Sequence, residues 1–297
     1  MNIPSLAGSQ RWRAFEWLSQ WFAHKHALKL QSPPVTPLRA WENLAEQHGQ
    51  RVRLNDNTSA LHWPIHLGPR RGRVLLLHDW GGRATQWSGF VPLLQAQGMD
   101  VVAVDVPGHG QSTLAASQPR QSAGQVSPFV EVIRDAQQQF GPFDAMVGHG
   151  LSAHVLAHLS PTDIQFTHPT ATLAQRLVLL APVIHWSALF TATQDRSAGA
   201  EVFWSRVLAE LEQSPYFRGL ETKSTVGFER SESVLIVHDE HDHRNSNHER
   251  QRWAFNWPQA EILTTNGLGA RKLLHSMEVQ FRVVQFICQQ QAVACAA

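Results

Sequence analysis

From residue 72 onward, short apolar runs alternate with longer amphipathic segments. The apolar runs are rich in Val, Leu and Ile, which is typical of parallel strands that are buried on both faces. Parallel strands need long crossover connections, and the amphipathic segments between the runs are suitable crossover helices. The pattern therefore predicts an α/β chain with a mostly parallel central sheet and helices on both of its faces.

Each element of this pattern can be given a position. Strands are predicted at 73–77, 101–104, 145–147, 177–180, 234–237 and, more weakly, 260–263. Helices are predicted at 87–97, 127–140, 151–159 and 277–290. The stretch 185–232, with a helix at 202–211, interrupts the alternation and is interpreted as a small helical cap inserted at the edge of the sheet.

The region before residue 72 has a different character. Residues 9–30 carry aromatic and aliphatic side chains at mostly helical spacing, which predicts an amphipathic helix: Trp12, Phe15, Leu18, Trp21 and Phe22. We expect its aromatic face to pack against the core, with membrane-surface contact or partner docking as alternatives. The expected division is 1–71 for this helix, a Pro-rich linker and leading strands; 72–184 and 233–290 for the core; 185–232 for the cap; and 291–297 for a tail.

Composition excludes several classes of protein. The 297 residues are 43% hydrophobic and 16% charged with a net charge of +1, which predicts a packed chain without the basic stripe that nucleic-acid binding requires. No apolar run is long enough for a transmembrane helix, and no secretory signal is evident. The two cysteines, Cys288 and Cys295, lie too close to the C-terminus to cross-link the fold, so we expect a cytoplasmic protein.

Five ordered motifs resemble one known family. They are LLLHDWGG at 75–82, DVPGHGQS at 105–112, DAMVGHGLSAH at 144–154, VLIVHDEHD at 234–242 and GLGARKLLHSMEV at 267–279. Together, over about residues 73–288, they are similar to the α/β-hydrolase superfamily of esterases, lipases and serine-peptidase-like enzymes. The resemblance implies the α/β-hydrolase fold and a Ser–His–Asp catalytic triad.

The triad positions depart from that family. The serine position of the nucleophile elbow is Gly150, and the histidine position is Ala270. The acid position is kept as Asp242, with Asp239 as second choice. Glycine cannot form an acyl-enzyme and alanine cannot accept a proton, so we expect no catalysis by the Ser–His–Asp mechanism.

The loop that supplies an oxyanion-hole donor also departs from the family. Asp79 follows His78 in place of the usual glycine, and its carboxylate would repel a developing oxyanion unless it turns away from the pocket. The backbone N–H groups of Trp80 and Leu151 could still bind a neutral carbonyl. We expect His78, like His109, to form loop hydrogen bonds.

A rearranged catalytic set is the alternative for the chemistry. Ser152 stands two residues after Gly150 and could act as nucleophile, with His149 or His154 as base and Asp242 as acid. His275 lies five residues after Ala270, more than one helical turn away, and is a weaker substitute. The simpler interpretation makes Ser152 a helix-packing serine and His275 a surface or helix-capping residue.

Two further groups of residues are candidate ligand-binding sites. The segment 238–249 holds four His and four acidic residues, but it fits no known metal motif, so we expect neither a metal nor a cofactor. Trp80 on the oxyanion loop, with Trp186 and Trp204 in the cap, could line a pocket, although packing of helices on the sheet explains them equally well.

The sequence leaves three functional classes open. The leading hypothesis is a catalytically inactive α/β-hydrolase-fold protein that binds a small apolar or acyl-type ligand, or a protein partner, in the former active-site cleft. An esterase acting on small esters with the rearranged set is the second class. A scaffold that assembles through the N-terminal aromatic helix is the third.

Overall fold

A single eight-stranded sheet organises the molecule. The computed structural model describes residues 7–34, 36–113, 127–159, 173–193, 200–214, 216–218, 220, 232–245 and 247–289, with backbone only for 7–15, 191–193 and 247–249. The sheet order is β1-β2-β4-β3-β5-β6-β7-β8. Its strands are β1 Gln50–Arg53, β2 Ser59–Trp63, β3 Gly72–Leu77, β4 Met99–Asp105, β5 Ala145–His149, β6 Arg176–Leu180, β7 Ser233–Asp239 and β8 Glu261–Thr265.

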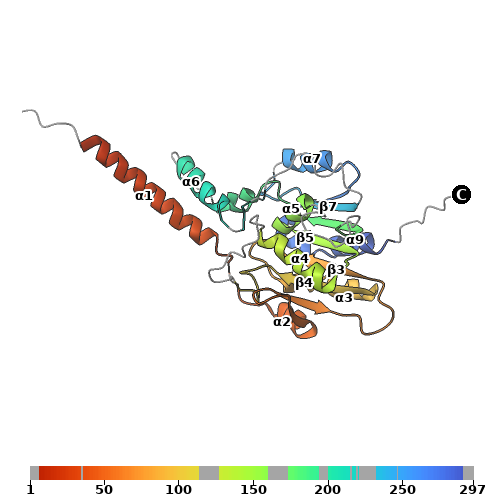
Figure 1. The fold of residues 1–297 in the computed structure, drawn as a ribbon. Coiled ribbons are helices and arrows are strands. Elements are labelled where there is room, and N and C mark those ends of the chain that lie inside the picture. The colour runs from red at the N-terminus through yellow and green to blue at the C-terminus, as the bar shows by residue number, and fades with distance from the viewer. Residues whose placement is uncertain are drawn as a thin grey trace, which may run out of the picture.

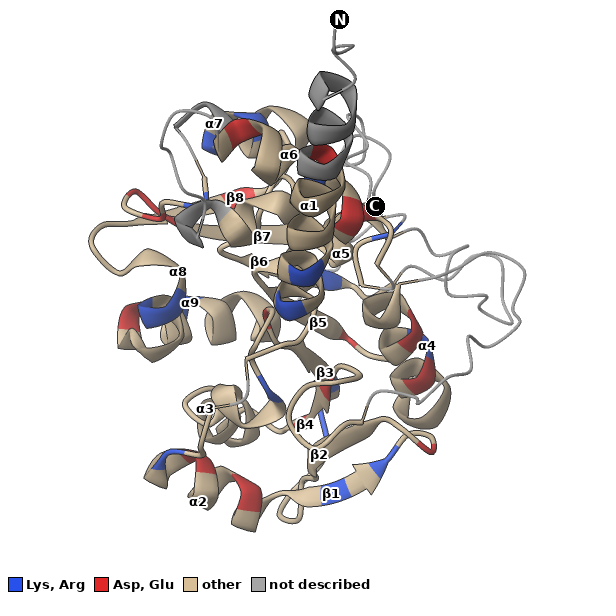
Figure 2. Cartoon of the chain, turned by 90° about the vertical axis from the view of Figure 1, so that its left-hand side faces the viewer, with Lys and Arg blue, Asp and Glu red and all other residues tan. Residues whose placement is uncertain are grey.

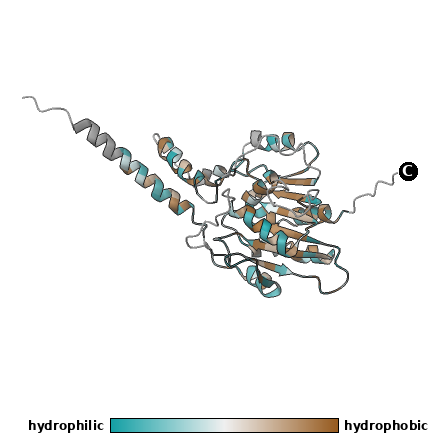
Figure 3. Ribbon diagram, in the orientation of Figure 1, coloured by the Kyte–Doolittle hydropathy of each residue, from teal (hydrophilic) through white to brown (hydrophobic). Residues whose placement is uncertain are grey.

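The six strands β3 to β8 are parallel to one another, while β2 is antiparallel to both β1 and β4. The six predicted strands lie within or overlap β3 to β8. The central strands are apolar along their length (Figure 3), as expected for parallel strands covered on both faces. The predicted α/β fold with a mostly parallel sheet is therefore confirmed.

Helices cover both faces of the sheet. The helical elements are α1 Ala7–Leu30, α2 Ala40–His48, η1 Ala84–Trp87, α3 Val91–Ala96, α4 Pro128–Phe140, α5 Leu151–His158, η3 Trp186–Thr193, α6 Ala200–Glu212, α7 Asn247–Asn256, α8 Gly269–Lys272, η4 Leu273–His275 and α9 Met277–Cys288. Figure 2 shows α3 and α9 on one side of the sheet and α4 and α5 on the other. Among the described residues, alternate side chains of β3 belong to different core clusters, Leu75 and Leu77 to that of α4 and α5 and Val74 and Leu76 to that of α3 and α9.

Some predicted boundaries are wrong. The helix predicted at 87–97 is split, because the chain makes the 3-10 turn η1 before α3 begins at Val91 with Pro92 in its first turn. α2 and α7 have no counterpart among the predicted elements. Both are short and rich in polar residues.

α1 extends away from the body of the molecule and lies beside α6 (Figure 1). Its Ala23 and Ala27 are buried in the same core cluster as Trp204 and Val207 of α6. Small alanine side chains allow two helices to approach closely, and they occupy the contact side of α1. The rings of Trp17, Trp21 and Phe22 are exposed instead.

The exposure of α1 overturns one expectation. Trp17 is 63% exposed, Trp21 44% and Phe22 56%, so the expectation that the aromatic face packs on the core is wrong for these residues. The predicted side-chain roles of Trp12 and Phe15 lie outside the described side chains. No described helix is both long enough and apolar enough to cross a membrane.

Candidate functional site

Three loops meet at the carboxyl ends of the central strands, where ligand sites of open α/β sheets form. Asp79 follows β3, Gly150 follows β5, and Asp242 and Arg244 follow β7. The hydrogen bonds and ion pairs among these loops connect residues up to 165 positions apart in the sequence. The site is therefore a product of the sheet topology.

Gly150 forms the sharp turn between β5 and α5. Its φ of 57° and ψ of −113° lie in a region that side chains rarely adopt, and its N–H donates to the carbonyl of Leu180 at 2.9 Å. A Cβ added at Gly150 would lie 2.0 Å from both Cγ and Oδ1 of Asp79. The elbow thus keeps its turn, but the carboxylate of Asp79 occupies the space of a side chain at this position.

The Asp79 carboxylate points into the site. Its Oδ1 accepts a hydrogen bond from the backbone N–H of Trp80 at 2.8 Å and another from that of Leu151 at 2.7 Å. These are the two donors that the sequence suggests for an oxyanion or a carbonyl. Both are therefore engaged by a carboxylate from the protein itself.

Arg244 holds this carboxylate from the other side. Its Nη1 donates to Oδ2 of Asp79 at 2.8 Å, while its Nε and Nη2 each donate to Asp242 at 3.1 Å. Side-chain exposures of 13% for Asp79, 17% for Arg244 and 4% for Asp242 show that little solvent screens these charges. Asp242, the expected triad acid, is thus the partner of an arginine.

The charges of this ion cluster, Asp79, Arg244 and Asp242, stabilise one another. Burial raises the pKa of Asp79, but Arg244, His149 and the two backbone donors lower it by more, so its pKa lies below the ordinary value. Burial lowers the pKa of Arg244, but the two carboxylates raise it above its ordinary value. Asp79 is therefore ionised at neutral pH.

Arg244 was not among the candidate site residues predicted from the sequence. The sequence hints at a role for Arg244 only through its position two residues after Asp242, in a chain that also has Asp79 on the oxyanion loop. Two carboxylates expected at the same end of the sheet need a cation when they are shielded from water. Charge balance alone could have suggested Arg244.

His149, beside the elbow, forms a hydrogen bond with the segment that contains Ala270. The Nε2–H of His149 donates to the carbonyl oxygen of Ala270 at 2.9 Å, and the Gln86 amide lies 3.4 Å from Nδ1. Burial lowers the pKa of His149, which is therefore neutral at pH 7. The imidazole at this site connects two loops.

The serine and histidines of the rearranged catalytic set form hydrogen bonds with other groups, and none with one another, in the described residues. The buried Ser152 hydroxyl donates to the carbonyl of His78. His154, whose pKa burial lowers to about 3, donates from Nδ1 to the carbonyl of Val183 at 2.9 Å. His275 is exposed and packs edge-on against Trp41, with ring centroids 5.3 Å apart.

His78 and His109 form the loop hydrogen bonds expected of them. His78 donates from Nδ1 to the carbonyl of Asp79 at 2.7 Å and accepts at Nε2 from the N–H of Val106 at 3.0 Å, and burial lowers its pKa to about 4. Nδ1 of His109 lies 3.2 Å from the carbonyl of Pro107, and burial lowers its pKa to about 3. Both are neutral structural histidines.

The tryptophans considered for a pocket contact other aromatic rings. Trp80 lies 5.0 Å from His109, 4.8 Å from Tyr216 and 5.1 Å from Phe217, measured between ring centroids. Trp186 stacks on Phe217 at 4.8 Å. Trp204 packs against His26 of α1 at 5.2 Å, which places it at the helix pair.

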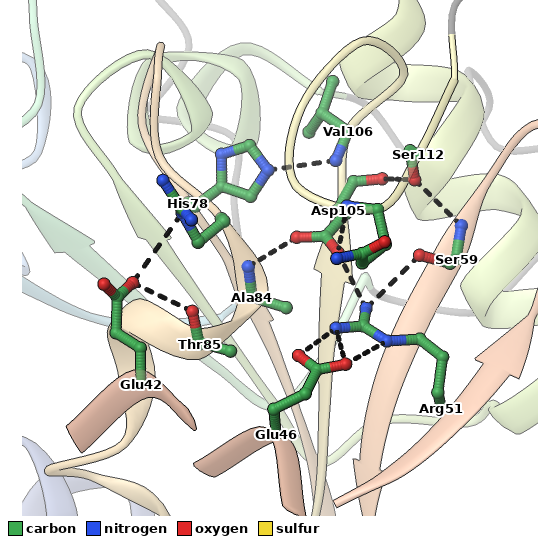
Figure 4. Close-up of polar contacts among 12 residues, drawn as sticks. Glu42, Glu46, Arg51, Ser59, His78, Ala84, Thr85, Asp105, Val106 and Ser112 are labelled. Carbon is green, nitrogen blue, oxygen red and sulfur yellow. Dashed lines mark hydrogen bonds and ion pairs between the residues drawn. The ribbon is translucent and has the colours of Figure 1, made fainter. Parts of the chain in front are cut away.

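A second polar network anchors the loop that follows β4 (Figure 4). Arg51 donates to the buried Asp105 at 2.7 Å and also pairs with Glu46. Asp105 accepts from the N–H groups of Ala84 at 2.6 Å and Gln111 at 3.1 Å. This network joins β1 and α2 to the DVPGHGQS loop and to η1, behind the site.

The histidine-rich segment does not gather metal ligands where it is described. Nε2 of His238 lies 3.0 Å from Oγ1 of Thr264, and Asp239 accepts from the N–H groups of His241 and Leu268 and from the hydroxyl of Thr265. No group of three or more possible ligands occurs among the described residues. The side chains of His248 and Glu249 lie outside them.

Comparisons with known proteins agree with this architecture. Two curated proteins match short stretches: the pimeloyl-[acyl-carrier protein] methyl ester esterase of Methylococcus capsulatus, 42% identical over 52 residues, and the biotin biosynthesis bifunctional protein BioHC of Teredinibacter turnerae, 40% identical over 55 residues. Each stretch is 18% of this chain, but only 20% of the first relative and 10% of the second.

Solved structures match over far more of the chain. The carboxylesterase CesB from Bacillus subtilis has a TM-score of 0.55 and 16% identity, covering 91% of this chain and 98% of its own. The 2-hydroxy-6-oxo-6-phenylhexa-2,4-dienoate hydrolase from Rhodococcus sp. strain RHA1 has a TM-score of 0.56 and 17% identity, covering 80% and 97%. At such identities these structures show a shared fold. The model of the alpha/beta hydrolase family matches residues 74–279, and the chain therefore belongs to this family.

Proposed function

We propose that this chain is a non-catalytic member of the α/β-hydrolase family that acts by binding a partner. One observation carries the proposal: the Asp79 carboxylate takes both backbone donors at the elbow and the space beside Gly150. A bound carboxylate product would accept hydrogen bonds from the same two donors. The site thus resembles a hydrolase active site with a carboxylate product bound, except that the carboxylate belongs to Asp79 of the chain itself.

In this proposal three requirements of serine hydrolysis are unmet: the nucleophile, its base and free oxyanion donors. Gly150 offers no alcohol oxygen, and Ala270 offers no imidazole. Losing a nucleophile or its base costs on the order of 10⁶-fold in rate, and losing one oxyanion donor about 10²-fold or more. The ion cluster leaves neither donor open.

The same geometry limits what the former active-site cleft can bind. A neutral ester or acyl carbonyl would have to displace an ionised carboxylate from two N–H donors and an arginine. Of the two ligand classes that the sequence suggests, we therefore favour a protein partner over an acyl-type ligand. We place this activity in the cytoplasm, consistent with the half-buried Cys288 being a free thiol.

An esterase with a rearranged site is the second candidate. The names of the matched relatives favour it, because one is a methyl ester esterase and another a carboxylesterase. Catalysis would require Ser152 to leave the carbonyl of His78 and to reach His149 or His154. Neither histidine is hydrogen-bonded to Ser152 among the described residues.

Ester turnover and covalent labelling distinguish the two candidates. The purified chain is assayed on short and medium p-nitrophenyl esters and incubated with a fluorophosphonate probe, and its intact mass is recorded. We expect no turnover above buffer and no adduct. Stoichiometric labelling that is lost in Ser152→Ala would establish the esterase and end the non-catalytic proposal.

A further inference from the structure

The outward side of α1 combines apolar and basic side chains. Trp17, Trp21 and Leu28 share one helical stripe with Lys25, since they are spaced by four, four and three residues. Leu18, Phe22 and Lys29 form the adjoining stripe. We call these seven residues the outer face of α1, and all are exposed.

No acidic residue belongs to this face. Among residues 16–30 the one acid is Glu16, which lies 3.8 Å from Arg206 of α6. His24, at the border of the face, lies 2.9 Å from Glu210 of α6. Lys25 lies over the ring of Trp21 at 5.6 Å, so the lysine stems and the aromatic rings form one surface. The seven residues of the outer face are therefore either apolar or cationic, and the basic segments of α1 are drawn blue in Figure 2.

We propose that the outer face of α1 docks on an anionic lipid surface, with the helix lying in the plane of the headgroups. Tryptophan and phenylalanine rings partition to the boundary between headgroups and acyl chains. Lysines beside them extend their ammonium groups to lipid phosphates. The projection of α1 from the body of the molecule (Figure 1) gives a flat surface access to this side of the helix.

The charge of the face favours lipid over a second copy of the chain. A symmetric dimer through this face would bring the Lys25 and Lys29 ammonium groups of both copies together without a carboxylate on the face to pair with them. Lysine is also depleted at the cores of protein interfaces. An anionic membrane supplies the missing negative charge.

Cosedimentation with vesicles tests the proposal on the full chain. We expect binding to phosphatidylcholine vesicles that contain phosphatidylglycerol to be about tenfold or more tighter than to phosphatidylcholine alone, and to weaken with added salt. Trp17→Ala with Trp21→Ala, and separately Lys25→Glu with Lys29→Glu, should each reduce binding about tenfold or more. Exposed side chains are changed, so the far-ultraviolet circular dichroism should stay that of the parent.

Matched controls lie outside α1. Leu67→Ala removes a side chain that is 92% exposed, and Lys272→Glu reverses an exposed charge on α8. Both should bind vesicles like the parent chain. The proposal would be overturned if vesicles with and without anionic lipid bound the chain equally well, or if the α1 variants bound vesicles as the parent does. So would sedimentation equilibrium showing a dimer that the tryptophan variant dissociates, because the occupant would then be a second copy.

Discussion

At the scale of single residues, Asp79 and Gly150 depend on each other. Any Cβ at position 150 would overlap the Asp79 carboxylate, and that carboxylate satisfies the N–H groups of Trp80 and Leu151. Restoring a serine at the elbow alone would therefore place two groups in one space. A glycine at position 150 and an aspartate at position 79 are therefore sterically matched in this structure.

Gly150→Ala should separate steric overlap from backbone strain. We expect it to lower the free energy of unfolding by more than about 2 kcal/mol, because a forced overlap adds to the cost of a positive φ. Gly267→Ala is the control, since its φ is also positive but its Cβ would meet nothing within 4 Å. Urea denaturation measures both. In an Asp79→Gly background the two alanine variants should cost the same; an unchanged excess at position 150 would contradict the account.

Arg244→Met should leave two shielded carboxylates without their cation. We expect a loss of about 3–5 kcal/mol at pH 7, against under about 1 kcal/mol for Arg282→Met, which breaks a more exposed pair with Glu261. Urea denaturation at pH 7 measures both losses.

The pH dependence of the Arg244 variant has a definite sign. In the parent, the lowered pKa of Asp79 contributes stability at neutral pH that is lost as pH falls through that pKa. Arg244 is the largest of the influences that lower the pKa of Asp79, so its removal should raise that pKa. Protonation of Asp79 at lower pH should then increase the stability of the variant relative to the parent. The stability deficit of the variant should shrink as the pH falls and Asp79 becomes protonated, and a deficit that is the same at every pH would contradict the role given to Arg244.

The sequence predicts these residues only in part. Gly150, Ala270 and Asp242 are predicted as the triad positions from the spacing of the motifs along the chain. The direction of the Asp79 side chain is set by the N–H of Leu151 and by Arg244, which are 72 and 165 residues away. Contacts across such separations leave no local pattern.

At the scale of elements, strands are easier to predict than helices in this chain. Buried parallel strands such as β3 and β6 are continuous apolar runs, which stand out in any sequence. α1 shows the opposite case. Its aromatic spacing predicts a helix, but the small Ala23 and Ala27, rather than the large rings, decide which side packs.

Ala23→Asp should detach α1 from α6 without unfolding the sheet. A carboxylate replacing a fully buried methyl group has no partner there, so the helix pair should separate. Limited proteolysis should then cut within residues 16–30, while the free energy of unfolding of the core changes by less than about 0.5 kcal/mol. Gln20→Asp, on an exposed position, is the control. Protection of α1 in both variants would contradict this packing.

At the scale of the whole molecule, the chain has the α/β-hydrolase fold, while Gly150 and Ala270 stand where the motifs lead one to expect the catalytic serine and histidine. The sheet order, the elbow turn and the loop after β4 are intact, and the Arg51–Asp105 network fixes that loop from behind. Asp79, Gly150 and Asp242 lie beyond the carboxyl ends of β3, β5 and β7, and Ala270 lies in α8. A binding role needs this framework, whereas it does not need a nucleophile.

Acetate binding to Asp79→Gly tests the central claim most directly, because acetate matches the side chain that the variant lacks. With the carboxylate removed, the N–H groups of Trp80 and Leu151 and the Arg244 guanidinium should form an empty anion site. The melting temperature of Asp79→Gly should rise saturably with acetate and stay level with sodium chloride of equal ionic strength, while the parent chain responds to neither. An equal response of parent and variant, or none in either, would contradict a carboxylate-filled elbow.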